Sequence, residues 1–253
     1  WHTSLIGALN LSQISFENWS QGGENTLTFT LTGELNLTYK SNSWNFKNYL
    51  KTSFGKAKIG DDDIRQTDNE VYLEDVLSYN VGWAVDPYIS NTVRTAITEG
   101  FDYGKTPALK ITDFFDPGYI SQSLGFSYNS SEIIQTRMGL AFQETFTDEL
   151  KNYSDDPETK DEVEDFRFET GIESVTDAKF NVDENLIYTS KLRLFTRFEN
   201  LDIWDVRWDN IMTAKVNSWL SVNLNVILIH EISQTRKTQL KEALQVGIIY
   251  TII

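Results

Sequence analysis

The sequence predicts an all-β protein: a transmembrane antiparallel up-and-down β-barrel of about twelve strands, formed by residues 1–253 as a single domain. Three observations predict this fold. Long segments alternate apolar and polar residues, short and long connections alternate along the chain, and the apolar faces are too bulky for a barrel interior. No helical period of 3.6 persists, and no Pro/Gly/Ser-rich linker divides the chain.

The clearest alternation lies in residues 26–39, where Leu27, Phe29 and Leu31 alternate with threonines. Alternation with a period of two places one set of side chains on each face of a strand, and this run far exceeds the usual strand of about 5–6 residues. The same pattern, bounded by turn residues, predicts the remaining strands. We expect strands at residues 3–16, 26–40, 44–59, 70–85, 87–102, 119–129, 132–146, 163–176, 183–198, 205–216, 218–232 and 239–252.

The connections between these strands sort into two sets. The short ones are expected at residues 42–43, 86–87, 129–131, 177–183 and 217–218. The longer ones are expected at residues 17–25, 60–69, 103–118, 147–162, 200–204 and 233–238. Bacterial outer-membrane barrels have short periplasmic turns and longer outer loops, so the pattern places both termini on the periplasmic side.

The residue types on the two strand faces predict which face meets lipid. One face collects bulky apolar groups such as Trp44, Phe54, Phe126, Leu140 and Leu224, which suit a lipid-facing belt. Tyr and Trp gather near the predicted strand ends, as in the interfacial aromatic girdles of membrane barrels. The chain has no apolar run long enough for a transmembrane helix, although its mean hydropathy of −0.36 by itself resembles that of a soluble protein.

The opposite face carries charged side chains that we expect to line the lumen. The candidates for setting solute selectivity are Arg94, Arg137, Arg167, Glu169, Lys191, Arg193, Arg197, Arg207, Asp209 and Lys215. One interpretation is a basic strip that guides anions through a pore. The other is a set of salt bridges that fills a narrow barrel, since eight strands give a filled interior and 16–18 leave a channel.

Charge and composition exclude several other functions. A net charge of −15 argues against a nucleic-acid-binding protein, and the absence of cysteine excludes disulfides and thiolate metal sites. The two histidines, His2 and His230, form no catalytic pair with a neighbouring acid, so no enzymatic activity is expected. Acidic runs at residues 61–63 and 155–165 could bridge a divalent cation, but they lack EF-hand spacing and suit solvated loops better. We expect neither a metal nor a cofactor.

Three motifs resemble an uncharacterised family of Bacteroidota-type outer-membrane β-barrels, known as a domain of unknown function. Residues 10–16 (NLSQISF) with 17–23 (ENWSQGG) are similar to its opening segment. Residues 113–119 (DFFDPGY) followed by 123–128 (SLGFSY) are similar to its central motif, and 241–247 (KEALQVG) to its closing strand. The resemblance implies an outer-membrane barrel and no catalytic residues. Such barrels usually end in an aromatic residue, whereas this sequence ends in YTII at residues 250–253, so either the insertion signal is degenerate or the native end lies beyond Ile253.

These features lead to two hypotheses of function. The first is porin-like passage of small solutes through a polar lumen. The second is a non-conducting structural or partner subunit that contacts other outer-membrane proteins through its outer loops. A soluble lipid-binding barrel would require the two faces to be exchanged. We expect an outer-membrane location, a bilayer as the main partner, and a signal peptide removed before Trp1.

Overall fold

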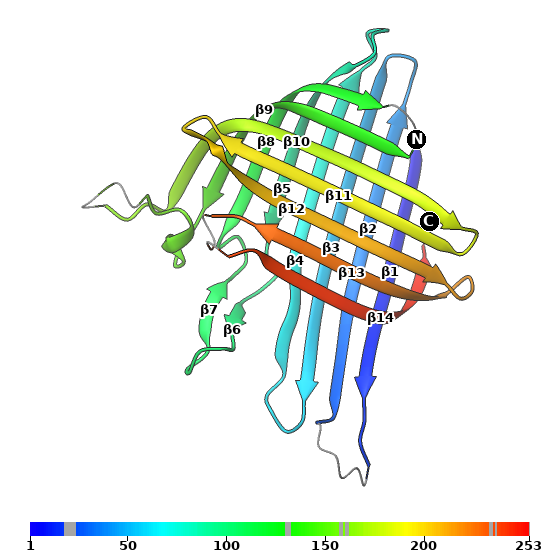
Figure 1. The fold of residues 1–253 in the computed structure, drawn as a ribbon, viewed down its shortest axis with the longest axis vertical. Helices are drawn as coiled ribbons and strands as arrows, with labels where there is room; N and C mark the ends of the chain where they lie inside the picture. Colours follow the sequence, from blue (N-terminus) through cyan, green and yellow to red (C-terminus); the bar gives the residue numbers. More distant parts are fainter. Residues whose placement is uncertain are drawn as a thin grey trace.

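The computed structural model describes residues 1–17, 24–129, 133–156, 159, 162–232, 235 and 237–252. Twelve long antiparallel strands close into a barrel, in which β1 pairs with both β2 and β14 (Figure 1). The barrel strands are β1 (His2–Ile14), β2 (Thr26–Lys40), β3 (Trp44–Ile59), β4 (Arg65–Tyr79), β5 (Asp86–Thr95), β8 (Gly118–Asn129), β9 (Ile134–Phe146), β10 (Phe166–Asp183), β11 (Leu186–Arg197), β12 (Asn200–Lys215), β13 (Leu220–His230) and β14 (Gln239–Thr251).

Two smaller elements lie in the longest connections. β6 (Gly100–Asp102) and β7 (Leu109–Thr112) form a separate two-stranded sheet between β5 and β8, and this hairpin projects from the end of the barrel that carries the long connections (Figure 1). A single 3-10 turn, η1 (Lys151–Tyr153), lies between β9 and β10. Within the described ranges, no helix is long and apolar enough to cross a bilayer.

The two faces of the sheet differ as the alternation predicts. The barrel interior is polar, and its buried side chains include Ser53, Glu74 and Glu173. Large apolar side chains point outward instead, with exposed fractions of 51 % for Leu31 and 66 % for Leu244. An apolar exterior around a polar interior is the arrangement of a membrane barrel, whereas a soluble barrel reverses it. The predicted transmembrane antiparallel barrel of twelve strands is therefore confirmed.

Aromatic rings mark the short-turn end of this apolar exterior. Trp44 at the start of β3 lies against Tyr79 at the end of β4, with ring centroids 4.7 Å apart. Trp1 contacts Tyr39 in the same way, with centroids 5.1 Å apart. Amphipathic rings prefer the headgroup level, so these pairs indicate where the hydrocarbon layer ends on this side.

Several predicted strand boundaries are wrong. The strand expected at 87–102 ends at Thr95, and β4 ends at Tyr79, so residues 80–85 form the turn expected at 86–87. β10 runs through the link expected at 177–183, and its turn is residues 184–185. β12 begins at Asn200, so the long connection expected at 200–204 is strand and only residues 198–199 join β11 to β12.

Parts of other expected features lie outside the described residues. These are residues 18–23 of the opening motif, residues 130–132 at the turn after β8, residues 157–158 and 160–161 of the β9–β10 connection, residues 233–234 and 236 before β14, and residue 253.

Candidate functional site: the barrel lumen

The lumen is crossed by charged side chains that meet from opposite walls. β4 supplies Glu70, Tyr72 and Glu74, which are two residues apart and therefore share the inward face. β9, β11 and β12 supply Arg137, Lys191 and Arg207 from the facing wall. The pairs they form join residues as far apart in sequence as Glu70 and Arg207.

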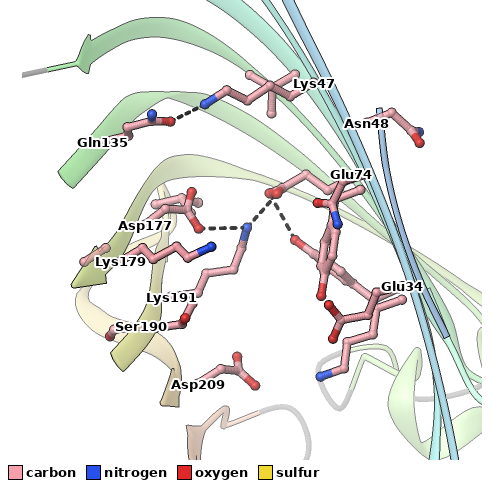
Figure 2. Close-up of a pocket in the computed structure, with 18 of the residues that line it drawn as sticks. Glu34, Lys47, Asn48, Glu74, Gln135, Asp177, Lys179, Ser190, Lys191 and Asp209 are labelled. Atoms are coloured by element: carbon pink, nitrogen blue, oxygen red, sulfur yellow. Dashed lines mark hydrogen bonds and ion pairs between the residues drawn. The ribbon is translucent and has the colours of Figure 1, made fainter. Parts of the chain in front are cut away.

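Glu74 is the centre of the first cluster. Its carboxylate accepts a hydrogen bond from the Tyr72 hydroxyl at 3.0 Å. It also forms ion pairs with the Lys191 ammonium, at 2.6 Å, and with the Arg137 guanidinium. Asp177 on β10 lies 3.2 Å from the same ammonium (Figure 2). The carboxylate is buried, and its cationic partners compensate for its lost hydration.

The second cluster lies closer than the first to the end of the barrel that carries the long connections. The Arg207 guanidinium reaches Glu70 at 2.8 Å and Asp209 at 2.9 Å. Arg94 on β5 approaches Glu70 at 3.3 Å, and its guanidinium lies over the Tyr72 ring, 5.0 Å from the centroid. Two arginines, one phenol ring and one shared carboxylate therefore meet at this level of the lumen.

A third cluster follows on β10, β11 and β12. Arg193 pairs with Glu173 at 2.7 Å, and Arg197 pairs with Asp205 at 2.8 Å and with Glu169. Phe195 lies between the two arginines, with each guanidinium carbon 5.5 Å from its ring centroid. Its exposed fraction is 0 %, which makes it a buried aromatic group inside an otherwise polar lumen.

Two cavities lie in the space that remains. A cavity of about 670 Å³ extends to the short-turn end, where Asn45, Ser78 and Ser127 belong to its lining. A second cavity of about 60 Å³ lies on the other side and reaches Tyr119, Gln143 and Glu231. The side chains that line both cavities, and therefore lie between them, are Tyr72, Arg94 and Arg207.

The cavity on the short-turn side is lined by both signs of charge. Glu34, Lys47, Lys51, Asp177 and Lys179 all contribute to it (Figure 2). The Lys47 ammonium donates to the Gln135 side chain on the facing strand β9. A volume of this size lies in the range of small-molecule pockets, about 300–1,000 Å³, so the cavity can accommodate a small polar solute.

The structure places the ten predicted lumen residues in different surroundings. Those that line the larger cavity are Arg94, Arg137, Lys191, Arg207 and Asp209. Arg193 lines the smaller cavity. Arg167, Glu169 and Arg197 lie together in the third cluster, with Arg167 3.0 Å from Glu169. Lys215 is the last residue of β12, is exposed, and has no ion pair among the described residues.

The prediction missed several acids that face these basic groups. Glu70, Asp177 and Asp205 fell at the edges of predicted strands or in predicted connections, so they were not counted as inward. Glu70 could have been found, because it lies four residues before Glu74 on the same strand face. Each predicted lumen arginine, and Lys191, has an acidic partner within 4 Å, so the basic strip is neutralised.

The central motif at residues 113–119 lies outside the lumen and organises the long connections. The Asp116 carboxylate is buried and accepts hydrogen bonds from the backbone N–H groups of Asp148, Glu149 and Leu150, at 2.9–3.3 Å. Phe115 has a positive φ of 57° and donates its N–H to the Thr95 hydroxyl at 2.7 Å. The motif therefore joins the β5–β8 and β9–β10 connections.

An ion-pair cluster beside this motif joins the β6–β7 hairpin to the same connections. The Lys110 ammonium lies 2.6 Å from Asp113, 2.9 Å from Glu149 and 3.6 Å from Glu99. The hydrogen bond that the Lys110 ammonium donates to the Asp113 carboxylate raises the pKa of Lys110, and the same bond lowers the pKa of Asp113. Both groups are therefore charged across the neutral pH range.

Neither histidine lies near a catalytic constellation. His2 begins β1 at the short-turn end, whereas His230 ends β13 at the other end and its Nδ1 lies 3.1 Å from the Thr238 hydroxyl. In the part of the chain that the structure describes, no group of three His, Cys, Asp or Glu side chains is placed to hold a metal ion. The absence of enzymatic activity stays a prediction.

Comparison with solved structures finds membrane barrels of low similarity. A NanC porin has 8 % identity and a TM-score of 0.43, with 99 % of this chain and 100 % of that chain covered. An outer membrane channel from Pseudomonas putida F1 has 9 % identity and a TM-score of 0.41, covering 98 % and 94 %. The translocator domain of the autotransporter NalP from Neisseria meningitidis has 9 % identity and a TM-score of 0.39, covering 98 % and 86 %.

These similarities are too low to argue about function, and the fold is established by the closed strand order itself. No curated protein matches the sequence. Residues 11–101 match a family model described as "Protein of unknown function (DUF3078)", which confirms the resemblance to an uncharacterised family over that part of the chain.

Proposed function

We propose that the protein is a β-barrel of the bacterial outer membrane whose lumen is closed at rest, so that it acts as a non-conducting structural or partner subunit. The apolar exterior, the polar interior and the sorting of most long connections to one end support the outer-membrane location. The pairing of the lumen arginines and Lys191 with acids supports the closed state, because these described groups do not form an unpaired basic strip that could guide anions.

One observation carries this proposal: Tyr72, Arg94 and Arg207 lie between the two cavities, Glu70 pairs with both arginines, and the Tyr72 hydroxyl donates to Glu74. Separating a buried ion pair leaves an uncompensated charge and costs about 3–5 kcal/mol when one partner is removed. Spontaneous opening of this layer should therefore be rare.

Porin-like passage of small solutes remains the second candidate, and one observation favours it. The layer between the cavities consists of side chains from the barrel strands, without an inserted loop or helix among the described residues. Rotation of the Tyr72 ring and the two arginines would join the cavities without rearranging the backbone.

A liposome-swelling assay separates the two candidates. Purified protein is inserted into vesicles that are then diluted into an isotonic solution of a small neutral sugar, and swelling reports sugar entry. The closed barrel predicts no swelling above protein-free vesicles for the wild type and clear swelling for a variant combining Tyr72→Ala and Arg207→Ala. Rapid swelling of the wild type would instead establish porin-like passage.

The matched control combines Tyr250→Ala and Arg65→Ala. Tyr250 points outward with an exposed fraction of 72 %, and Arg65, the first residue of β4, pairs with Asp62 at 2.7 Å. These changes remove the same side-chain types without touching the lumen. Vesicles that contain this control variant should be as impermeable to the sugar as vesicles that contain the wild type.

A further inference from the structure

A row of polar side chains crosses the lipid-facing surface of the barrel. Asn48 on β3 is the cross-strand partner of Asp75 on β4, Asp75 is the partner of Asn91 on β5, and Asn91 is the partner of Gln122 on β8. Each is next in sequence to an inward-facing residue, as Asp75 is to Glu74. Because successive side chains of a strand point to opposite faces, each member of the row points outward. In Figure 2 the Asn48 side chain points away from the lumen side chains, although Asn48 also contributes to the lining of the larger cavity.

This polar row, residues Asn48, Asp75, Asn91 and Gln122, lies inside the apolar belt. On β4 the outward neighbours of Asp75 are Leu73 and Leu77, and apolar residues flank the other members in the same way. Asp75 is four residues from Tyr79, whose ring pairs with Trp44 at the membrane boundary. At about 3.3 Å per residue and a tilt of about 40°, the carboxylate lies about 10 Å inside the belt.

The position of Asp75 is unusual among the outward charges of the barrel. Lys56, Glu144 and Glu242 lie two or three residues from the long-connection ends of β3, β9 and β14, where a charge on the lipid face costs little. Ionisable groups within the hydrocarbon layer are rare and normally have a partner.

The row has hydrogen-bonding capacity that the chain itself does not use. The Asn48 amide donates to the Asp75 carboxylate at 2.7 Å, which leaves further lone pairs on Asp75. The side-chain amides of Asn91 and Gln122 have no partner within the described ranges.

A second outward polar cluster, on β11 and β12, provides the contrast. There Tyr188 and Ser190 both donate to the Asn210 side chain, at 2.5 Å and 3.1 Å, and the Trp208 indole N–H donates to Ser190 at 2.9 Å. That cluster is satisfied within one chain, whereas the polar row is not.

We propose that the polar row is the interface of a homodimer in the membrane, and that a second copy of this chain covers it. In a membrane the two-fold axis must run along the bilayer normal. Because the strands are tilted, the row is inclined to the membrane plane, and an axis between β4 and β5 makes the rows of the two copies cross at Asp75 and Asn91. Asp75 of one copy then faces Asn91 of the other, whereas Asn48 and Gln122 lie away from the crossing point. Every contact occurs twice, as in any isologous interface.

The polar groups of the row are complementary to those of a second copy of the same chain. The Asp75 carboxylate, which has free lone pairs, meets the Asn91 amide, which has free N–H donors, so each of these two groups finds in the second copy a partner that it lacks in its own chain. Lipid tails offer no such groups, and an unsatisfied polar group in hydrocarbon is costly. The row supplies both donor and acceptor, so no other protein is needed to complete it.

Cysteine cross-linking tests this geometry directly, because the chain contains no cysteine. Copies carrying Asp75→Cys are mixed with copies carrying Asn91→Cys, reconstituted in lipid and oxidised. The dimer predicts a disulfide-linked product at twice 29.1 kDa that forms only in the mixture. The control mixture carries Leu224→Cys and Leu244→Cys, which are also outward cross-strand partners but lie on β13 and β14. It should give no product.

The second measurement is the monomer–dimer equilibrium in lipid nanodiscs or vesicles. Combining Asp75→Leu and Asn91→Leu should weaken dimerisation by about tenfold, since two equivalent pairs are lost and each hydrogen bond within a bilayer contributes about threefold. Glu242→Leu, which removes an outward carboxylate near a strand end, should leave the equilibrium unchanged.

Three results would overturn the proposal: a wild type that stays monomeric at every protein-to-lipid ratio, equal cross-linking in the control mixture, or cross-linking of position 75 to a different protein only. The dimerisation measurements do not depend on conductance. Failure of the closed-lumen proposal would therefore not affect this test, and failure of the dimer proposal would not affect the swelling assay.

Discussion

The Glu74 carboxylate on β4 lies 2.6 Å from the Lys191 ammonium on β11, so two residues separated by 117 positions in the chain pair across the barrel. Arg137 on β9 completes the contact from a third strand. A single acid thus ties three separate strands together through the lumen, and both the stability of the barrel and the closure of its lumen depend on such contacts.

Replacement of Glu74 should therefore destabilise the barrel. Glu74→Gln keeps the shape of the side chain but leaves Asp177 as the remaining anion beside Arg137 and Lys191, and we expect the free energy of unfolding to fall by about 3–5 kcal/mol. Unfolding by guanidinium in lipid vesicles, followed by tryptophan fluorescence, measures this change. Glu242→Gln on the outward face is the matched control and should change the free energy by less than about 0.5 kcal/mol. Equal effects of both variants would contradict the account.

Phe195 offers a second test of lumen packing. Its ring is fully buried between Arg193 and Arg197 and lies against Gly171, where an added Cβ would come within 3.0 Å of the ring. Phe195→Ala should lower the free energy of unfolding by about 3–5 kcal/mol, as for other buried aromatic truncations. Phe168→Ala, on an outward residue with an exposed fraction of 52 %, should cost clearly less in the same assay. A smaller loss at Phe195 than at Phe168 would refute this role.

The sequence predicted the barrel because strand alternation is a local property. The bounds of β2 and β3 agree with the prediction residue for residue, since both strands alternate cleanly up to a turn. The end of β5 at Thr95 was not predictable in this way. There the chain leaves the barrel because distant groups hold it: the Thr95 hydroxyl accepts the Phe115 N–H, and Ala96 bridges to Phe114.

The lumen was only partly predictable for the same reason. Parity identified Arg137, Lys191 and Arg207 as inward, but it cannot tell which acid each of them meets across the barrel. Partners such as Glu70 and Asp177 lie on other strands, and the pairing depends on barrel closure and register. The basic strip was an overestimate because acids at the edges of predicted strands or in predicted connections were not among the predicted lumen residues.

The Asp116 carboxylate should keep the long connections conformationally ordered. Asp116→Ala removes the acceptor of three backbone N–H groups, those of residues 148–150, and so leaves them without a partner. We expect hydrogen exchange at these three amides to accelerate by at least about tenfold, because hydrogen bonds to a charged acceptor contribute about 1.5–3 kcal/mol. Amides in β2 should exchange as in the wild type. Unchanged protection at residues 148–150 would show that other contacts hold the connection.

The ion pairs of Lys110 should make the β6–β7 hairpin sensitive to extreme pH. The pKa of Asp113 is lowered, so its contribution is present above the ordinary Asp pKa of about 3.9 and is lost as the pH falls through the lowered value. The pKa of Lys110 is raised, so its contribution is present below about 10.4 and is lost as the pH rises through the raised value.

A spin label at position 109, introduced by Leu109→Cys on the exposed side of the hairpin, reports this order by electron paramagnetic resonance. Its spectrum should stay constant between about pH 4 and pH 10 and sharpen outside that window. In a Lys110→Gln background the sharp spectrum should appear already at neutral pH. A wild-type spectrum that changes within the window would contradict the assignment.

Single-channel recording in a planar bilayer tests the central claim, the closure of the lumen by the layer of Tyr72, Arg94 and Arg207. Wild-type protein whose insertion is verified independently should give no discrete conductance steps, whereas the variant combining Tyr72→Ala, Arg94→Ala and Arg207→Ala should give steps. Discrete steps from the wild type at low voltage would show that the lumen conducts with its ion pairs in place, and would contradict the account.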